Sequence, residues 1–306
     1  WAADVAKIAE RHIVRINNLI ETDEKARKLF ERFLNGLHKN INDSISEEDA
    51  VGMLAQHMIT RPVFDALFAE YQFVNNNAVS RSMQDMIEVL ESEGMEMDTQ
   101  VLEKFYISVR NNVTNIDNLE GKQTIIKNLY EKFFKGAFPK TVEKLGIVYT
   151  PVECVDFIIN SVEDILQSEF NTSLTNENVH ILDPFTGTGT FITRLLQSGL
   201  IKKEDMLRKY KNEIHCNEIV LLAYYIADVN IESVFHEIMP PGHYENYGGI
   251  CLTDTFQLNE HGNNDIFSQL FPENSERLKK QKDAPVRVII GNPPYSIGQK
   301  SANDDA

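Results

Sequence analysis

The sequence predicts a chain in two parts: an all-α helical domain over residues 1–140, and an α/β domain over residues 141–306 built on a parallel, doubly wound sheet. Three observations lead to this prediction. Apolar residues recur at helical spacing up to about residue 140, Gly, Pro and Lys residues interrupt that pattern over 136–146, and short apolar runs then alternate with helical stretches. Such alternation is typical of a parallel sheet covered by helices.

In the first part, apolar stripes indicate the core of a helical bundle. The stripes are Ile8, Ala9, Ile13, Ile16, Leu19 and Ile20; Val51, Leu54, Ala55, Met58 and Ile59; Val101, Leu102, Phe105, Tyr106 and Val109; and Ile125, Ile126, Leu129, Tyr130, Phe133 and Phe134. Ser46, followed by Asp49 three residues later, indicates a helix start. Arg81, Arg110 and the asparagines at 75–77 and 111–112 are expected on surfaces and in turns.

In the second part, the pattern predicts four strands and three helices. The strands are expected at 179–183, 213–217, 248–252 and 286–290, and the helices at 151–167, 190–198 and 218–230. The polar stretch 257–285 is expected to be an irregular excursion between the last two strands. Because the chain stops soon after the fourth strand, we expect the sheet to be truncated at its C-terminal end.

Composition narrows the function classes. Apolar and charged contents of 42% and 25% are those of a soluble globular protein, and no apolar run is long enough to span a bilayer. The widely spaced Cys154, Cys216 and Cys251 are interpreted as reduced core residues of a cytoplasmic protein rather than metal ligands. The net charge of −16 argues against a broad nucleic-acid surface on this stretch. Trp1 in place of Met indicates a piece of a longer polypeptide.

A glycine loop follows the first predicted strand. The run ends at Asp183 and continues through Phe185, Gly187 and Gly189 into a helix. A loop of this kind presents backbone N–H groups at the carboxyl end of a strand, where small ligands bind in open α/β sheets. A tight turn without a ligand is the alternative, and the dinucleotide pattern is not met because no third Gly follows at the required spacing.

Three polar positions around this loop have a functional and a structural interpretation. Thr150, with Pro151 and Glu153, fits a helix capping box, and the capped helix N-terminus can also face a carboxylate ligand. Glu218, after the second strand, can accept hydrogen bonds from ribose hydroxyls or complement a helix N-terminus. Asp254, after the third strand, can accept from an adenine amino group, and Phe256 can cover the ring.

The sharpest signal follows the fourth strand, where Gly291 leads into Asn292, Pro293, Pro294 and Tyr295. The two prolines rigidify the backbone and remove two donors, so the Asn292 side chain and the Pro293 carbonyl present acceptors. Two acceptors that hold both N–H bonds of a conjugated amino group draw its nitrogen toward a tetrahedral shape and free the lone pair. Tyr295 can then stack on a flat substrate. A proline-rich turn without function is the alternative.

Taken together, these elements resemble the S-adenosylmethionine-dependent amino-methyltransferases, and above all the adenine-N6 DNA methyltransferases with the gamma-type motif order. The matching motifs are 149–151, the loop 183–191 and the tetrapeptide 292–295. The longer phrases 146–151 and 291–301 resemble Type ISP restriction–modification enzymes, in which a nuclease and a motor precede a helical coupler, the methyltransferase and a target recognition domain. The resemblance is specific over about 140–306 and rests mainly on position and helicity over 1–140.

The resemblance implies a Rossmann-like sheet and a role for each motif residue. Thr150 would hold the methionine carboxylate of S-adenosylmethionine, and Asp183, Phe185, Gly187 and Gly189 would line its methionine and ribose. Glu218 would bind the ribose hydroxyls, and Asp254 and Phe256 the adenine. Asn292 and Pro293 would bind the amino group of a flipped adenine in double-stranded DNA, and Tyr295 would stack on that base. Pro294 would belong to the same catalytic motif.

The resemblance implies site-specific adenine-N6 methylation within a restriction–modification enzyme, with the other domains of a longer chain as partners. No membrane and no metal ion are expected to take part. Two alternatives remain. A protein glutamine-N5 methyltransferase faces the same chemical problem at a side-chain amide, and a non-catalytic coupler would link a DNA motor to a methyltransferase. We expect these 306 residues alone not to methylate DNA sequence-specifically.

Overall fold

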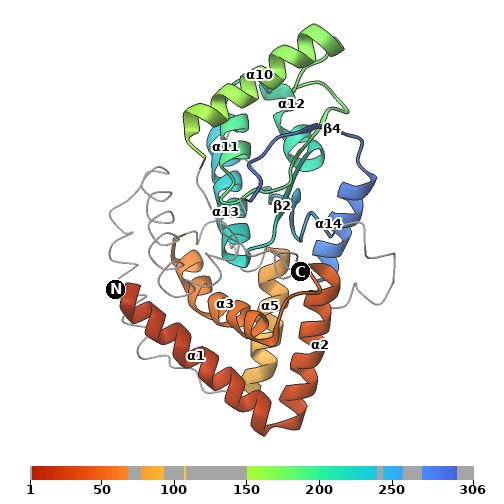
Figure 1. Ribbon diagram of the computed structural model, residues 1–306. Helices are drawn as coiled ribbons and strands as arrows, with labels where there is room; N and C mark the ends of the chain where they lie inside the picture. Colours follow the sequence, from red (N-terminus) through yellow and green to blue (C-terminus); the bar gives the residue numbers. More distant parts are fainter. Residues whose placement is uncertain are drawn as a thin grey trace, which may run out of the picture.

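The computed structural model describes residues 2–67, 77–92, 107, 150–239, 244–257 and 271–294, which form a helical part and an α/β part (Figure 1). The helical part contains α1 (Ala2–Thr22), α2 (Glu24–Asn40), α3 (Glu47–Leu67) and α5 (Ala78–Ser92). At the start of α3, the backbone N–H of Ser46 donates to the Asp49 carboxylate and that of Asp49 to the Ser46 hydroxyl, both at 3.1 Å. The helix start predicted there is confirmed.

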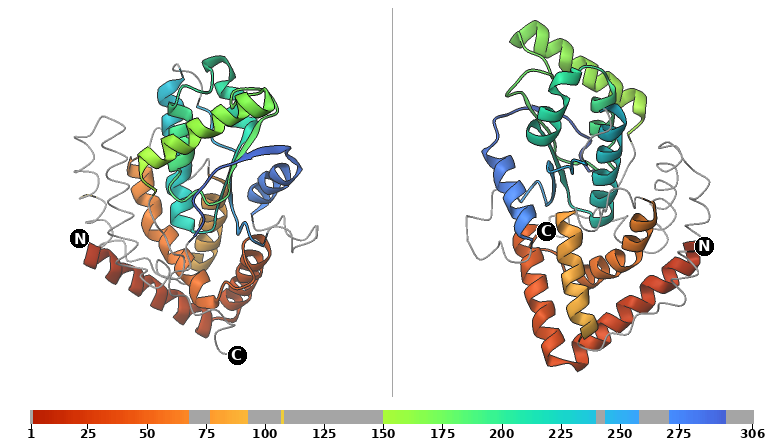
Figure 2. Two further views of the ribbon diagram at one scale, coloured as in Figure 1. Left: turned by 45° about the horizontal axis from the view of Figure 1, so that its top comes forward. Right: turned by 180° about the vertical axis from the view of Figure 1, so that it is seen from behind.

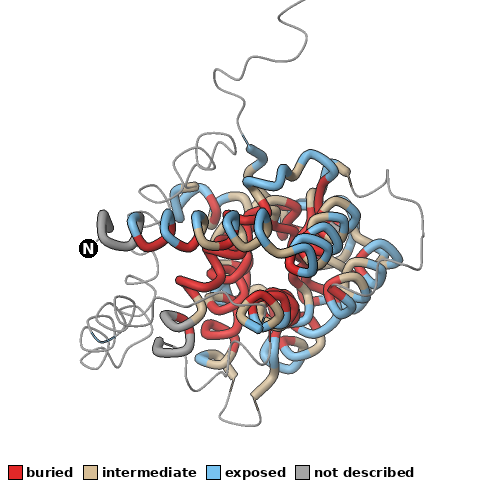
Figure 3. The backbone as a smooth tube through the Cα atoms, turned by 90° about the horizontal axis from the view of Figure 1, so that it is seen from below, coloured by how far each residue is buried: buried red, intermediate tan, exposed pale blue. Residues whose placement is uncertain are grey.

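The apolar stripes of α1 and α3 face the core, as predicted. Ile8, Ala9 and Ile16 of α1 are buried, and so are all five residues of the stripe over 51–59. The two later stripes, over 101–109 and 125–134, consist of residues that lie outside the described ones. Figure 3 shows the buried positions gathered on the inward sides of the helices in both parts, and the buried apolar side chains of the two parts form one cluster.

The α/β part is a parallel sheet with the strand order β3-β2-β1-β4. Its strands are β1 (His180–Asp183), β2 (Ile214–Glu218), β3 (Ile250–Leu252) and β4 (Val286–Ile289), close to the predicted positions. The strand order reverses between β1 and β4. In open α/β sheets, the carboxyl ends of the strands beside such a reversal form the crevice in which ligands bind.

Helices cover both faces of this sheet (Figures 1 and 2). On one face, α10 (Val152–Phe170) packs on α11 (Thr190–Gln197), and α11 packs on α13 (Leu221–Ile238). On the other face lies α14 (Pro272–Asp283), against the edge strand β3. Parallel strands are as a rule joined by right-handed crossovers. The helices therefore lie on one face while the chain runs from β1 to β3, and on the other face where it returns to β4. None of the described helices is long and apolar enough to cross a membrane.

The helical part packs directly on the α/β part. Helix α3 lies against α13, which explains why α13 is buried on nearly every side, and α5 lies against α14. Asn77, expected in a surface turn, is instead buried: its side-chain oxygen accepts the Ser80 N–H at the start of α5, and its Nδ2 donates to Asp228 Oδ2 of α13 at 2.7 Å. Sequence periodicity does not report such a contact, because the partner is about 150 residues away.

Three further predictions are corrected by the structure. The stretch 257–285 is not wholly irregular, because α14 occupies 272–283; its buried residues, Asn274 and Gln281, are polar, so no apolar stripe marked the helix. The capping box at Thr150 does not form, because α10 begins at Val152 with Pro151 as its cap and has no side-chain capping bond. Cys154 is exposed on α10, whereas Cys216 and Cys251 are buried.

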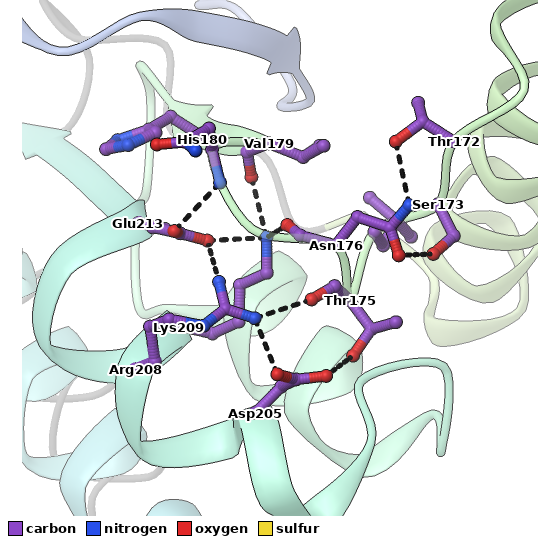
Figure 4. Close-up of polar contacts among 12 residues, drawn as sticks. Thr172, Ser173, Thr175, Asn176, Val179, His180, Asp205, Arg208, Lys209 and Glu213 are labelled. Carbon is purple, nitrogen blue, oxygen red and sulfur yellow. Dashed lines mark hydrogen bonds and ion pairs between the residues drawn. The ribbon is translucent and has the colours of Figure 1, made fainter.

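A buried polar cluster lies at the amino ends of β1 and β2 (Figure 4). Helix α12 (Lys203–Arg208) runs into a π-helix, η3 (Lys209–Glu213), that leads directly into β2. The fully buried Lys209 donates to the carbonyls of Asn176 and Val179 at 2.6 and 2.9 Å and pairs with Glu213 at 2.7 Å. Because these polar groups are satisfied by one another, we assign the cluster a structural role.

Candidate functional site

The glycine loop after β1 lies over the carboxyl edge of the sheet. Gly187 and Gly189 both adopt positive φ angles, +56° and +86°, which favour glycine over residues with a Cβ. A Cβ at position 189 would also lie 3.3 Å from Ala227 Cα on α13, so this glycine allows the loop and α13 to approach closely. A Cβ at position 187 would have no neighbour within 4 Å, so there is open space beside the loop at this residue. The predicted loop geometry is confirmed.

Asp183 ends β1 with a completely buried carboxylate. One oxygen accepts the backbone N–H of Phe185 at 3.1 Å, and the other, Oδ2, has no hydrogen-bond partner in the part of the chain that the structure describes. Burial is the main cause that raises the pKa of Asp183 to about 8; the Phe185 N–H acts in the opposite direction, and the nearby charge of Glu218 adds to the rise. A buried acceptor without a donor is costly, so Asp183 is suited to a ligand that brings a positively charged or N–H group.

Glu218 ends β2 and holds the glycine loop in place. One carboxylate oxygen accepts the Gly187 N–H and the other accepts the Val220 N–H, each at 2.7 Å. Burial raises the pKa of this carboxyl to about 7, while the backbone N–H groups of Val220, Gly187 and Ile219 act in the opposite direction. The functional and the structural interpretations of Glu218 are therefore not exclusive, because the same carboxylate orders the loop and lies at its base.

The motif after β4 lies beside Asp183. The Ile290 N–H donates to the Leu182 carbonyl at 3.0 Å, and a Cβ at position 291 would lie 2.7 Å from Asp183 Oδ1, so Gly291 allows the contact. Asn292 is partly buried, and Pro293 and Pro294 are exposed. Tyr295 lies outside the described residues. The structure therefore brings the start of the predicted catalytic motif next to the glycine loop.

The segment after β3 completes this edge. The Thr255 hydroxyl donates to the Pro184 carbonyl at 2.7 Å, which joins the segment to the glycine loop. The Phe256 ring, 69% exposed, lies 5.2 Å from that of Phe185. Asp254 accepts the Phe256 N–H at 2.9 Å. Asp254 and Phe256 thus lie at the same edge as the glycine loop, whereas Thr150 precedes α10 and its role stays a prediction.

Two asparagines that the sequence reasoning missed also belong to this edge. Asn217, fully buried in β2, accepts the Thr186 N–H through its backbone carbonyl and donates from its side-chain Nδ2 to the Thr255 hydroxyl at 3.2 Å. Asn230 of α13 donates to the Thr188 carbonyl at 3.0 Å. The available signal for Asn217 was its place near the carboxyl end of a strand, directly before Glu218. Asn230 carries no comparable signal, because an asparagine in a helix is ordinary.

Comparisons with family models match the whole chain in two consecutive pieces. Residues 1–121 match the coupler domain of Type ISP restriction–modification enzymes, and residues 121–306 match the N-6 DNA methylase family. The predicted boundary at 140 lies outside the described residues and stays a prediction. A search of curated proteins finds no match.

Solved structures of longer enzymes resemble the chain throughout. One is a nuclease-deletion mutant of the Type ISP restriction–modification enzyme LlaGI in complex with a DNA substrate mimic. It is 48% identical with a TM-score of 0.89, and the match covers 100% of this chain and 25% of the LlaGI chain. The ATP-dependent Type ISP enzyme LlaBIII bound to DNA is 49% identical with a TM-score of 0.89 over 100% and 21%. A DrdV–DNA complex is 34% identical with a TM-score of 0.81 over 99% and 30%. The chain thus spans less than a third of each of these proteins.

Proposed function

The chain belongs to the N-6 DNA methylase family, with a Type ISP coupler domain ahead of the methylase part, and on this basis we propose that it serves site-specific adenine-N6 methylation of DNA within a restriction–modification enzyme. One observation supports this proposal above the others. At the reversal of strand order, the glycine loop after β1 and the motif that begins at Gly291 lie in contact, since a Cβ at 291 would be 2.7 Å from Asp183 Oδ1. A methyl-donor site and a motif suited to an amino group would therefore be adjacent.

The methyl donor we propose is S-adenosylmethionine, which this family generally uses. The residues present fit that molecule: the unpartnered buried Asp183 Oδ2 suits its ammonium group, and the open space over Gly187 leaves room near the backbone. Glu218 would accept from the ribose hydroxyls, Asp254 would accept from the adenine amino group and Phe256 would cover the ring. Phe185 and Gly189 would shape the loop around the methionine and ribose. When bound, the cofactor supplies an electrophilic methyl group.

The chain's own part in the reaction would be to hold and activate the substrate amino group. Asn292 and the Pro293 carbonyl would accept its two N–H bonds, which makes the nitrogen lone pair available for attack. Pro294 would keep the backbone rigid, and Tyr295 would stack on the flat base. An adenine in duplex DNA must first leave the helix, which costs a few kcal/mol; stacking worth roughly 1–3 kcal/mol per base would offset part of this cost.

Duplex DNA and further domains of a longer chain are the partners we propose. The solved relatives are longer proteins in complex with DNA or a DNA mimic. The net charge of −16 supports the idea that most phosphate contacts come from elsewhere in such an enzyme, because phosphate binding needs basic side chains. We also propose a cytoplasmic location, which is supported by the absence of disulfides among the three cysteines.

Neither alternative is favoured by a specific observation. The matching methylase family acts on DNA, which counts against a protein glutamine as the substrate. The coupler interpretation is compatible with the main proposal for residues 1–121. Mass spectrometry of nucleosides from DNA treated with the full natural enzyme and S-adenosylmethionine tests the proposal. We expect N6-methyladenine; N4-methylcytosine would refute the assignment of the base, and unmodified DNA together with methylglutamine in a protein would refute the substrate class.

A further inference from the structure

The turn after α2, residues 41–46, reaches from the helical part to the segment 254–257 after β3. Asn42 Nδ2 donates a hydrogen bond to Asp254 Oδ2, and the Asp43 N–H donates to Gln257 Oε1 at 3.3 Å. These partners are 212 and 214 residues apart in the chain. The helical part thus contacts the same segment that carries the proposed acceptor for the cofactor adenine.

The orientation of Asn42 is set by its own turn. Its side-chain oxygen accepts the Ser44 N–H at 2.7 Å, so its amide nitrogen is directed at Asp254. Its backbone N–H donates to the Leu37 carbonyl at 3.3 Å, which continues the end of α2. Asn42 is only 9% exposed, so water does not compete freely for its side chain. The Asn42 amide is therefore a preorganised donor.

The same contact orients Asp254 without using up its capacity to accept. Asp254 Oδ1 accepts the Phe256 N–H at 2.9 Å, and Oδ2 accepts from Asn42. An ionised carboxylate has about four lone-pair positions, so a further donor can still be accommodated. With one donor on each oxygen, the carboxylate plane is fixed, and the remaining lone pairs point in defined directions.

We propose that Asn42 is a positioning residue of the cofactor site, supplied by the helical part. By holding the Asp254 carboxylate, it would favour a nucleobase that presents an amino group. This inference rests on the proposed function, because it needs S-adenosylmethionine or its demethylated product to bind with the adenine at Asp254. Binding free energies are reciprocal, so the bound cofactor would in turn strengthen the attachment of the turn 41–46 to the segment 254–257.

The test measures the affinity of the purified protein for two ligands by calorimetric titration. The ligands are S-adenosylhomocysteine and its 6-oxo analogue, in which hypoxanthine replaces adenine and an acceptor replaces the amino donor. We expect Asn42→Ala to bind S-adenosylhomocysteine about tenfold more weakly, as the loss of a charge-assisted hydrogen bond implies. The preference for adenine over hypoxanthine should fall in the same variant. Asn42→Asp should lose more affinity, because a like charge would face Asp254.

Two controls separate positioning from a general loss of structure. Arg81→Ala removes an ion pair with Glu273 that also joins the two parts but does not touch the segment 254–257, so both affinities should be unchanged. In an Asp254→Ala background, Asn42→Ala should have no further effect, because the carboxylate it positions is absent.

The possible results distinguish a failure of the positioning role of Asn42 from a failure of the proposed function. An affinity of Asn42→Ala within about twofold of the parent protein, or a loss that is equal for both ligands, would overturn the positioning role and leave the proposed function intact. Full affinity in Asp254→Ala would overturn the inference by removing Asp254 from the site. No binding of S-adenosylhomocysteine by the parent protein would contradict both the inference and the proposed cofactor.

Discussion

Replacement of Glu218 should disrupt the glycine loop, and it measures how far the stability of the loop and the binding of the cofactor depend on this one carboxylate. In Glu218→Ala, the N–H groups of Gly187 and Val220 lose acceptors that now lie 2.7 Å away. An unsatisfied buried donor costs about 1–3 kcal/mol. The full penalty applies to the Val220 N–H, which is buried, and a smaller one to the N–H of Gly187, which is partly exposed to water. We therefore expect the free energy of unfolding to fall by about 2–4 kcal/mol.

The effect of Glu218→Gln should depend on pH, and the sign follows from the raised pKa. A carboxyl whose pKa is raised to about 7 by burial stabilises the folded state at low pH and loses that contribution as the pH rises through 7. Gln cannot ionise, and it keeps only one acceptor for the two N–H groups. The variant should therefore be less stable than the parent protein at pH 6, and the difference should shrink by pH 8.

Urea unfolding followed by circular dichroism at both pH values measures this difference, and calorimetric titration with S-adenosylhomocysteine measures the site. Binding by Glu218→Ala should be lost or strongly weakened, because the loop and the ribose acceptor are removed together. An unfolding free energy within about 0.5 kcal/mol of the parent protein would refute the reasoning about the buried donors. A stability difference between Glu218→Gln and the parent that does not change with pH would refute the role of burial. Unchanged binding would place the cofactor elsewhere.

Three other substitutions test separate contacts. Gly291→Ala should cost about 1–3 kcal/mol by overpacking, because its Cβ would lie 2.7 Å from Asp183 Oδ1; urea unfolding at parental stability would contradict this. Asn77→Ala should cost about 2–4 kcal/mol in the same assay, since it removes the cap of α5 and a buried hydrogen bond to Asp228, and a change below about 0.5 kcal/mol would argue against that interface. In the full enzyme, Asn292→Ala should lower kcat on the order of 100-fold with little change in the KM for the cofactor, because the lost group acts in the transition state. Steady-state kinetics measure both constants, and an unchanged kcat would exclude Asn292 from the chemistry.

Local patterns predicted the strands and the two loops well. The apolar runs that end at Asp183 and Ile290 agree with the ends of β1 and β4 to within one residue. The glycines that follow them either adopt positive φ angles or allow a close contact that a Cβ would prevent. These features are predictable because they depend on neighbours in the sequence: periodicity, a turn and the absence of a Cβ. The same local reasoning failed at α14, whose buried residues are polar, and at Thr150, where the helix begins two residues later.

The sequence by itself determined that the chain has a helical part, a parallel sheet, a glycine loop and an Asn-Pro-Pro motif, because each depends on residues within one short segment. Only the tertiary structure decided that Asn77 is buried against Asp228 and that Asn42 donates to Asp254. These contacts join residues more than 150 positions apart, and a solvent-exposed turn would favour asparagine just as strongly. A polar residue in a turn becomes part of a site through the partner that folding brings to it, and its own sequence neighbourhood carries no record of that partner.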